Sequence, residues 1–290
     1  MPQLTKQSNK KTTPLREQMI MEMQLRNFSE RTIETYTDHV LQFAKYFMRS
    51  PEVLGDEHIR KYLHYSLVIK QHNASYVNVT RSALKFLYKQ VMNRPWDIEK
   101  IPAPKGERKL PEILSLEEVD CVLHTPRNLK HQMILMVTYS GGLRVSETTK
   151  LKLTDIDSKR MLIRVEQGKG KKDRYTLLSE PLLPDLRRYY KQFKPKHYLF
   201  EGRVPGKPLS EATLQTVFNK AKEAAGIQKQ VTFHTLRHCF ATHMLESGYG
   251  LEIIQKCMGH KNVQTTMRYL HIRHDHLQKV VSPLDQLLGD

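Results

Sequence analysis

The sequence is poor in cysteine. Cys121, Cys239 and Cys257 are an odd number, so they cannot all pair, and none of them lies at the short spacing typical of zinc ligands. This pattern excludes a disulfide framework and gives no sign of a structural metal site. We expect three reduced, buried thiols.

Long apolar runs are also missing. No stretch approaches the roughly 18 uninterrupted apolar residues of a membrane-spanning helix. The first residues contain Lys and Thr and lack the apolar core of a secretion signal. We therefore expect an intracellular, cytoplasmic protein without a membrane partner.

Acidic residues are scarce relative to basic ones. Lys and Arg total 47 against 30 Asp and Glu, and the resulting net charge of +17 suits a polyanionic partner such as nucleic acid. A basic surface can also serve solubility alone. Residues 58–96 favour the first interpretation, because they contain no Asp or Glu and so form a candidate phosphate-facing surface. Its basic residues are Arg60, Lys61, Lys70, Arg81, Lys85, Lys89 and Arg94.

Length and composition predict two domains. A chain of 290 residues exceeds the roughly 100–200 residues that are usual for one domain. Residues 101–111 (IPAPKGERKLP) are rich in proline and charge, and cannot bury enough apolar surface to fold alone. We assign residues 1–100 to an N-terminal helical domain, 101–111 to a linker and 112–290 to a second domain with a C-terminal tail.

Apolar residues at helical spacing predict about four helices in the first domain. One covers residues 14–26, and the next follows Ser29, which is a typical N-cap residue. The third contains Ile59, Leu63 and Leu67, and the fourth ends near Pro95. These helices predict a small bundle.

The second domain begins with helical patterns. Ser115 and Glu118 form a capping-box signature at the start of an apolar helix that we expect to run to about Ser140. Gly141-Gly142 then ends this helix before another begins near Val145.

A β-hairpin is predicted next, because residues 161–167 and 174–179 flank a glycine-rich, basic turn at 168–172. Gly226 and Gly248 are placed as helix stops. The later helices are expected at 180–193, 210–225, 235–247, 251–258 and 263–269. The fold class is thus mainly α with a small β-hairpin in the second domain.

Residues near the C-terminus could act on a phosphodiester. His234 and Arg237 lie three apart in HTLRH, a pair that is by itself more often structural than catalytic, and His260 and Tyr269 follow. A phenol with a pKa near 10 attacks phosphate poorly unless cations neutralise the charge on the non-bridging oxygens. Guanidinium groups supply that charge together with two parallel hydrogen bonds. The set therefore favours a tyrosine nucleophile assisted by arginine.

Five motifs in order, GGLRVSE, GKGKKDR, HTLRH, MGH and TTMRYLH, resemble those of the tyrosine recombinase (phage integrase) family, most closely its Xer-type members. They span the second domain, whereas the N-terminal helices resemble the family's core-binding domain only in pattern. The resemblance implies a catalytic domain that grips DNA together with the helical bundle. It also implies six catalytic residues, which are Arg144, Lys169, His234, Arg237, His260 and Tyr269.

The resemblance further implies what these residues do. Tyr269 is the nucleophile, Arg144, Arg237 and His260 stabilise the transition state, and Glu147 is a structural partner of Arg144. Lys169 is the general acid, although Lys171 and Lys172 share its hairpin tip. His234 either accepts the tyrosine proton or orients the phosphate, and both roles stay open.

The implied partners are double-stranded DNA and further subunits, as a homo-tetramer or hetero-tetramer on two DNA sites. Neither a cofactor, a metal nor a small-molecule substrate is implied, and the chain contains no GxxxxGK[ST] phosphate loop. Integration, excision and dimer resolution remain alternatives with the same chemistry. A more distant alternative is a DNA-binding regulator that kept the fold and lost the reaction.

Overall fold

The computed structural model describes residues 13–95, 103–104, 112–166, 173–260, 262 and 266–267. Two compact units make up the chain, Met1–Arg108 and Lys109–Asp290. Within the described ranges, no helix has both the length and the apolar character needed to cross a membrane.

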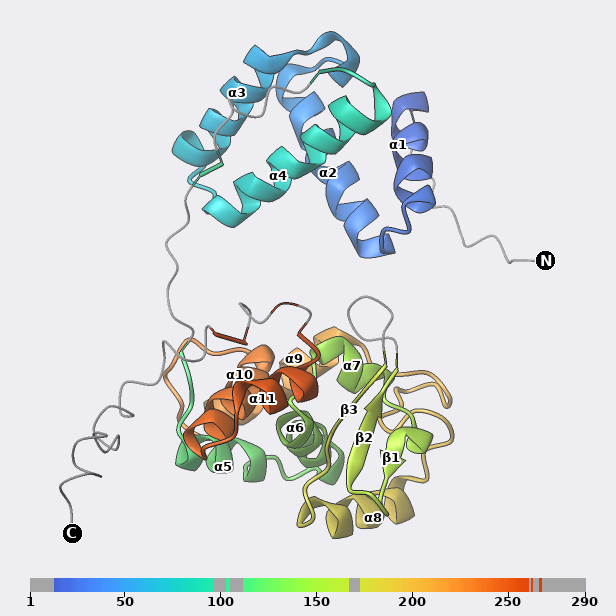
Figure 1. The fold of residues 1–290 in the computed structure, drawn as a ribbon, viewed down its shortest axis with the longest axis vertical. Coiled ribbons are helices and arrows are strands. Elements are labelled where there is room, and N and C mark those ends of the chain that lie inside the picture. Colours follow the sequence, from blue (N-terminus) through green and yellow to red (C-terminus); the bar gives the residue numbers. More distant parts are fainter. Residues whose placement is uncertain are drawn as a thin grey trace, which may run out of the picture. The chain divides into compact units, whose positions relative to one another are not determined.

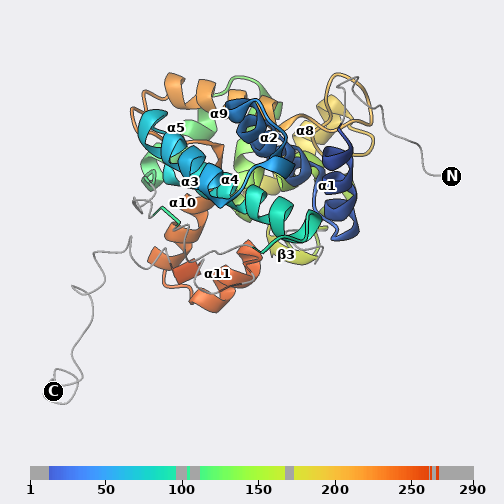
Figure 2. The same cartoon turned by 90° about the horizontal axis from the view of Figure 1, so that it is seen from above.

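The first unit is all helical (Figure 1). Its longer helices are α1 (Pro14–Leu25), α2 (Glu30–Phe47), α3 (Asp56–His64) and α4 (Ala74–Phe86), joined by the short helices η1 (Pro51–Val53), η2 (Tyr65–Ile69) and η3 (Leu87–Val91). Ser29 caps α2 by accepting a hydrogen bond from the backbone N–H of Thr32, as predicted. Figures 1 and 2 show α4 crossing α2 over a core that includes Phe43, Ile59 and Leu84.

The apolar spacing predicts that Leu67 lies on the same buried helical face as Ile59 and Leu63, and this prediction is wrong. Leu67 lies in η2, a π-helical turn, and is 38% exposed. A π turn holds more residues than an α turn, so the helical face that contains Ile59 and Leu63 does not continue through it. Ser66 is buried there instead and is hydrogen-bonded to Nδ1 of His72 at 3.0 Å.

The second unit is mainly helical with one small sheet, as predicted. Its helices are α5 (Leu116–His124), α6 (Leu129–Gly141), α7 (Val145–Lys150), η4 (Leu153–Asp155), α8 (Leu182–Phe193), α9 (Glu211–Ala224), α10 (Phe233–Glu246) and α11 (Leu251–Met258). Its strands are β1 (Ile156–Asp157), β2 (Leu162–Val165) and β3 (Arg174–Leu177). Gly226 and Gly248 both adopt positive φ after helices, as their assignment as stops requires.

The structure corrects the expectation of one helix from Ser115 to Ser140. Two helices, α5 and α6, occupy this stretch, with Pro126 between them. Proline lacks an N–H and clashes with the preceding turn, so α5 ends before it, and Asn128 caps α6. The predicted capping box is present, because Ser115 and Glu118 each accept a hydrogen bond from the other's backbone N–H.

The predicted hairpin is the pairing of β2 with β3, which are antiparallel with Ile163 opposite Thr176. Strand β1 joins the other edge of β2 and was not predicted, because two residues are too few to show a period. Ile163 and Val165 point into the main core of the unit. The hairpin turn itself and most of the predicted helix 263–269 lie outside the described residues.

The cysteines agree only in part with expectation. All three are free thiols, and Cys239 and Cys257 are buried. Burial raises the pKa of the Cys239 thiol to about 11, which keeps it protonated. The prediction of burial is wrong for Cys121, which is exposed.

Candidate active site

Arg144 lies in the turn between α6 and α7. Gly142 ends α6 with φ of +56°, and a Cβ atom there would lie 2.3 Å from the ring of Phe240, so only glycine fits this turn. Arg144 follows as the N-cap residue of α7. Its backbone N–H and its Nη1 donate to the two carboxylate oxygens of Glu147 at 2.8 and 2.6 Å, so Glu147 is the predicted partner of Arg144.

Glu147 is the centre of an arginine cluster. Its carboxylate also receives two parallel hydrogen bonds, each 2.8 Å long, from Nη1 and Nη2 of Arg174. Nη1 of Arg237 lies 3.6 Å from the same carboxylate. Burial would raise the pKa of Glu147, but hydrogen bonds and charge from Arg174 and Arg144 prevail and lower it to about 2. The carboxylate is therefore ionised at neutral pH.

Arg237 projects from α10 into the interior and is 1% exposed. Its Nη1 donates to the carbonyl oxygen of Gly142 at 2.6 Å, and its Nη2 donates to the carbonyl oxygen of Met258. A buried charge is tolerated only when its donors are satisfied. These bonds tie α10 to the turn before Arg144 and to the end of α11.

His234 occupies the first turn of α10, one helical turn before Arg237, and is exposed. Its ring meets that of His238 edge-on, with centroids 4.7 Å apart. Desolvation by the surrounding protein lowers the pKa of His234, the charges of Arg237 and Arg144 lower it further, and Glu147 opposes them. His234 therefore lies in the electrostatic field of the arginine cluster.

His260 follows the C-cap residue of α11, Gly259. Its Nδ1 is hydrogen-bonded to the hydroxyl of Thr266 at 2.9 Å. Burial lowers the pKa of His260 to about 3, with Arg237, Arg144, Arg174 and His238 contributing in the same direction. His260 is thus a neutral imidazole at pH 7 in the free protein.

Lys169 and Tyr269 lie outside the described residues, so their roles remain predictions from the sequence. Three other tyrosines of the second unit serve as packing or surface groups. Tyr189 is buried and donates to the carbonyl oxygen of Leu199, whereas Tyr175 and Tyr190 are exposed. His243, in the same helix as His234, is a packing residue, buried between the hydroxyl of Tyr139 and a backbone carbonyl.

Arg174 is a member of the cluster that the sequence interpretation missed. It is the last residue of GKGKKDR, a motif whose lysines were the predicted functional groups. Its partner Glu147 is 27 residues away in the chain, and no periodicity links the two. The signal available in the sequence was its position, because Arg174 ends this motif and opens the predicted strand 174–179.

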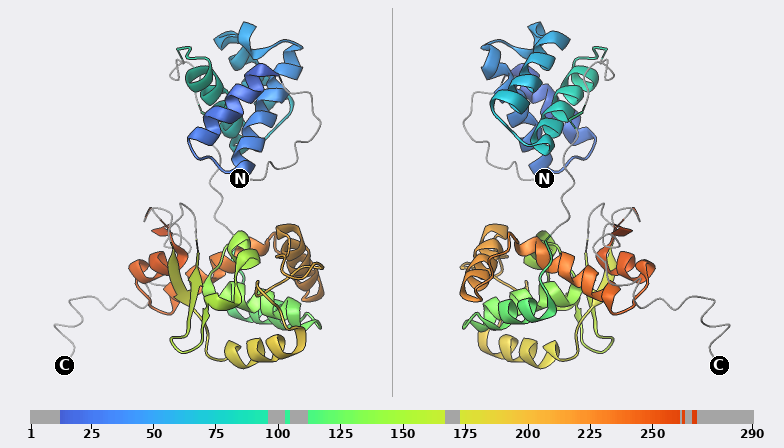
Figure 3. Two further views of the ribbon diagram at one scale, coloured as in Figure 1. Left: turned by 90° about the vertical axis from the view of Figure 1, so that its right-hand side faces the viewer. Right: turned by 90° about the vertical axis from the view of Figure 1, so that its left-hand side faces the viewer.

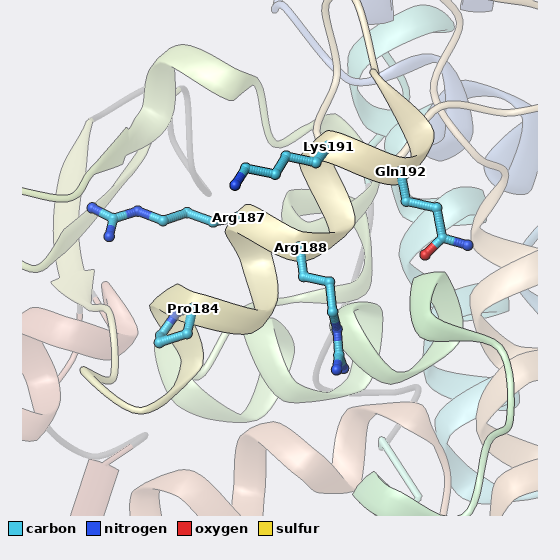
Figure 4. Close-up of a pocket in the computed structure, with 5 residues that line it drawn as sticks. All are labelled: Pro184, Arg187, Arg188, Lys191 and Gln192. Carbon is cyan, nitrogen blue, oxygen red and sulfur yellow. The ribbon is translucent and has the colours of Figure 1, made fainter.

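A second basic surface lies on α8, outside this cluster. Figure 4 shows Arg187, Arg188 and Lys191 extending from α8. They line a pocket of about 590 Å³. The opposite face of α8 packs against α6, at one edge of the unit in Figures 1 and 3. In the described part of the chain, no group of three His, Cys, Asp or Glu side chains could hold a metal ion.

Comparison with known proteins agrees with this arrangement. Residues 112–276 match the phage integrase family, and residues 15–98 match the SAM-like N-terminal domain of phage integrases. The chain belongs to the phage integrase family. Its motifs are those of the Xer-like tyrosine recombinases within it. Arg144 and Arg237, from two of these motifs, lie beside Glu147. His260, from a third motif, lies in the field of both arginines.

Relatives of this recombinase cover nearly its whole length. A putative integrase/recombinase of Sinorhizobium fredii is 42% identical over 276 residues, or 95% of this chain and 90% of the relative. The tyrosine recombinase XerC of Staphylococcus epidermidis is 32% identical over 272 residues, or 88% of this chain and 91% of that protein. A lambda integrase tetramer bound to a Holliday junction shares the fold, with a TM-score of 0.71 at 17% identity over 88% of this chain and 76% of that chain.

Proposed function

We propose that this protein is a site-specific DNA recombinase that cuts and rejoins DNA strands through a 3′-phosphotyrosine on Tyr269. The observation that carries the proposal is the cluster itself. Arg144 and Arg237 converge on one turn, beside His234 and His260, with three guanidinium groups sharing a single carboxylate. The excess positive charge suits a phosphodiester whose negative charge grows in the transition state.

The cleavage step is a displacement at phosphorus. The oxygen of Tyr269 forms a bond to the scissile phosphorus, its proton passes to a base, and the bond from phosphorus to the 5′ oxygen breaks. The 5′ oxygen leaves with a proton supplied by Lys169. Rejoining reverses these steps. The phosphotyrosine keeps the energy of the broken phosphodiester bond, so no nucleoside triphosphate is consumed.

The described residues bind the phosphate and donate or accept protons. Arg144 and Arg237 bind the non-bridging oxygens, since guanidinium groups stay charged at any pH the protein meets. When the Thr266 hydroxyl donates to Nδ1 of His260, the ring carries its proton on Nε2 and can donate it to phosphate. His234 is exposed and has a lowered pKa, which suits either proton acceptance or phosphate orientation.

The proposed partners are double-stranded DNA and other recombinase subunits. Both units of the chain carry basic surface. In 58–95, five of the seven basic residues are exposed, namely Arg60, Lys61, Lys70, Lys89 and Arg94. The lambda integrase relative is a tetramer on a Holliday junction, and we propose the same assembly here. The apolar residues Leu277, Val280, Val281, Leu284 and Leu287 of the tail would serve contacts between subunits.

A trapping assay tests the proposal. A labelled duplex carrying the target site, nicked next to the scissile phosphate, releases a short 5′-hydroxyl fragment after cleavage and so prevents rejoining. The wild-type protein should accumulate a covalent adduct that survives a denaturing gel, and Tyr269→Phe should bind the same duplex without forming one. Specific binding with no adduct from either protein would instead support a DNA-binding regulator. An adduct formed by Tyr269→Phe would assign the nucleophile to another residue.

A further inference from the structure

Arg174 is largely enclosed by residues of the candidate active site. It opens β3, directly after the hairpin turn, and its side chain is 9% exposed. Its Nη1 and Nη2 each donate to one oxygen of Glu147 at 2.8 Å, and its Nε donates to the carbonyl oxygen of Cys257 at 2.8 Å. These three bonds satisfy all three nitrogens of the guanidinium group with protein acceptors.

These contacts join three elements that are far apart in the chain. Glu147 belongs to α7 and Cys257 to α11, and Arg174 at the start of β3 bonds to both. Figure 1 labels the three elements. The side chain of Arg174 also lies against Gly259, where an added Cβ would be 2.6 Å from Cδ of the arginine. His260 is the next residue. Arg174 therefore contacts Gly259, which precedes His260, and Glu147, which pairs with Arg144.

The charges of the cluster explain why a third arginine is useful. Glu147 is the carboxylate partner of both Arg144 and Arg237. If it paired with these two alone, its negative charge would offset part of the positive charge that they present to phosphate. The close bidentate pairing with Arg174 adds a third positive charge that compensates the charge of Glu147. Consistent with this, Arg174 makes the largest favourable contribution to the low pKa of Glu147.

We propose that Arg174 is a positioning residue for DNA cleavage, which holds Glu147 and the end of α11 so that Arg144 and His260 meet the scissile phosphate. Arg174 does not itself touch the phosphate. This inference rests on the proposed recombinase function, and it adds a seventh residue to the six predicted from the motifs. It also couples the strand that follows the basic turn to the arginine cluster.

The test compares cleavage of a charged and a neutral phosphate. Arg174→Gln and Arg174→Lys are assayed on the nicked duplex with either an ordinary scissile phosphate or a methylphosphonate, which lacks the charge on one non-bridging oxygen. Because a displacement of about 1 Å can cost roughly 10²-fold in rate, we expect Arg174→Gln to cleave the ordinary site about 10²-fold slower than wild type. The fold reduction in its cleavage rate at the methylphosphonate should be at least tenfold smaller. A neutral phosphate has less negative charge for the arginines to stabilise, so their exact position affects the rate less.

Arg164→Gln is the matched control. Arg164 lies on the neighbouring strand, directly opposite Tyr175, and makes its ion pairs with Asp155 and Glu166 rather than with Glu147. The Arg164→Gln variant removes the same charge from the same sheet. Its cleavage rates should stay within about twofold of wild type on both duplexes. Arg174→Lys keeps the charge but cannot make the bidentate pair, so its rate should fall between those of wild type and Arg174→Gln.

The outcomes separate the inference from the proposed function. Equal deficits of Arg174→Gln on both duplexes, or a wild-type rate, would reduce Arg174 to a structural residue and overturn the inference. If Arg174→Gln does not fold, as judged by circular dichroism, the same comparison is read from Arg174→Lys. Absence of any adduct with the wild-type protein would overturn the recombinase function itself.

Discussion

At the scale of single residues, the candidate site holds positive charge without cancelling it. The guanidinium group of Arg237 is bonded to the carbonyl oxygens of Gly142 and Met258, while its ion pair with Glu147 is long, at 3.6 Å. Carbonyl groups satisfy the donors of a buried cation but carry no net charge. The arrangement thus satisfies the donors of Arg237 without neutralising its charge.

Lys169 is the predicted residue whose role most needs a direct test, because two other lysines share its turn. If Lys169 is the general acid, Lys169→Ala should cleave an ordinary site roughly 10²–10⁴-fold slower than wild type. Replacing the bridging 5′ oxygen with sulfur should restore nearly the wild-type rate, because a thiolate with a pKa near 8.5 leaves without needing a proton. The rate of adduct formation measures both effects.

Arg237→Ala is the control for this experiment, since its defect lies at the non-bridging oxygens and sulfur should not correct it. Rescue of Lys171→Ala or Lys172→Ala, with Lys169→Ala left inactive, would move the acid within the turn. Rescue of none of the three would place it elsewhere in the protein.

The titration of His260 and Glu147 predicts acid instability. The pKa of His260 is lowered from 6.5 to about 3, so between these values the unfolded chain binds a proton that the folded chain does not, and stability falls as the pH drops. Protonation of Glu147 also lowers stability, but at lower pH. Its pKa is lowered from 4.5 to about 2, so its stabilisation is complete above 4.5 and is lost toward pH 2.

His260→Gln should therefore lose less unfolding free energy than wild type between pH 7 and pH 5. Urea unfolding followed by circular dichroism at each pH gives the comparison. Parallel losses in the two proteins would mean that His260 titrates normally in the folded state.

At the scale of elements, the turn that carries Arg144 depends on glycine. Gly142 has φ of +56°, and Phe240 occupies the space where its Cβ would be. Gly226 is the matched control, because it also has positive φ, +71°, but nothing lies within 4 Å of an added Cβ. Strain at positive φ costs an alanine about 1 kcal/mol, and overpacking adds about 1–3 kcal/mol more.

We expect Gly226→Ala to lower the unfolding free energy by about 1 kcal/mol with cleavage unchanged. Gly142→Ala should lower it by about 2–4 kcal/mol and should also slow cleavage, because Arg144 is two residues away. Thermal unfolding and the trapping assay measure the two effects. Equal stability losses in the two variants would mean that the ring of Phe240 moves aside.

Elements with a strong local signal were predictable from the sequence. The bounds of α11 are those expected, and the caps at Ser29 and Ser115 start their helices as predicted. The break at Pro126 was missed because apolar spacing continues across it, and the π turn at Leu67 has no signature in composition. The motifs supplied Arg144, His234, Arg237 and His260, whereas the contact between Arg174 and Glu147 depends on how strand and helix meet in space.

At the scale of the whole molecule, each unit contains an acid-free stretch with five exposed basic residues. Residues 58–96 belong to the first unit, and residues 186–200, which include most of α8, belong to the second. If the net charge of +17 alone attracted DNA, both stretches would contribute alike. If the first stretch faces phosphate, then of these two stretches only the first should contact a short target site.

Two variants with equal loss of charge distinguish these cases. One changes to Gln the five exposed residues of the first stretch, which are Arg60, Lys61, Lys70, Lys89 and Arg94. The other does the same to the five exposed residues of the second stretch, which are Arg187, Arg188, Lys191, Lys194 and Lys196. Binding to a short duplex is measured by titration at several salt concentrations. Since each phosphate contact adds about 0.9 to the slope of log affinity against log salt, the first variant should lose several times more slope than the second. Equal losses would show that residues 58–96 act only through net charge.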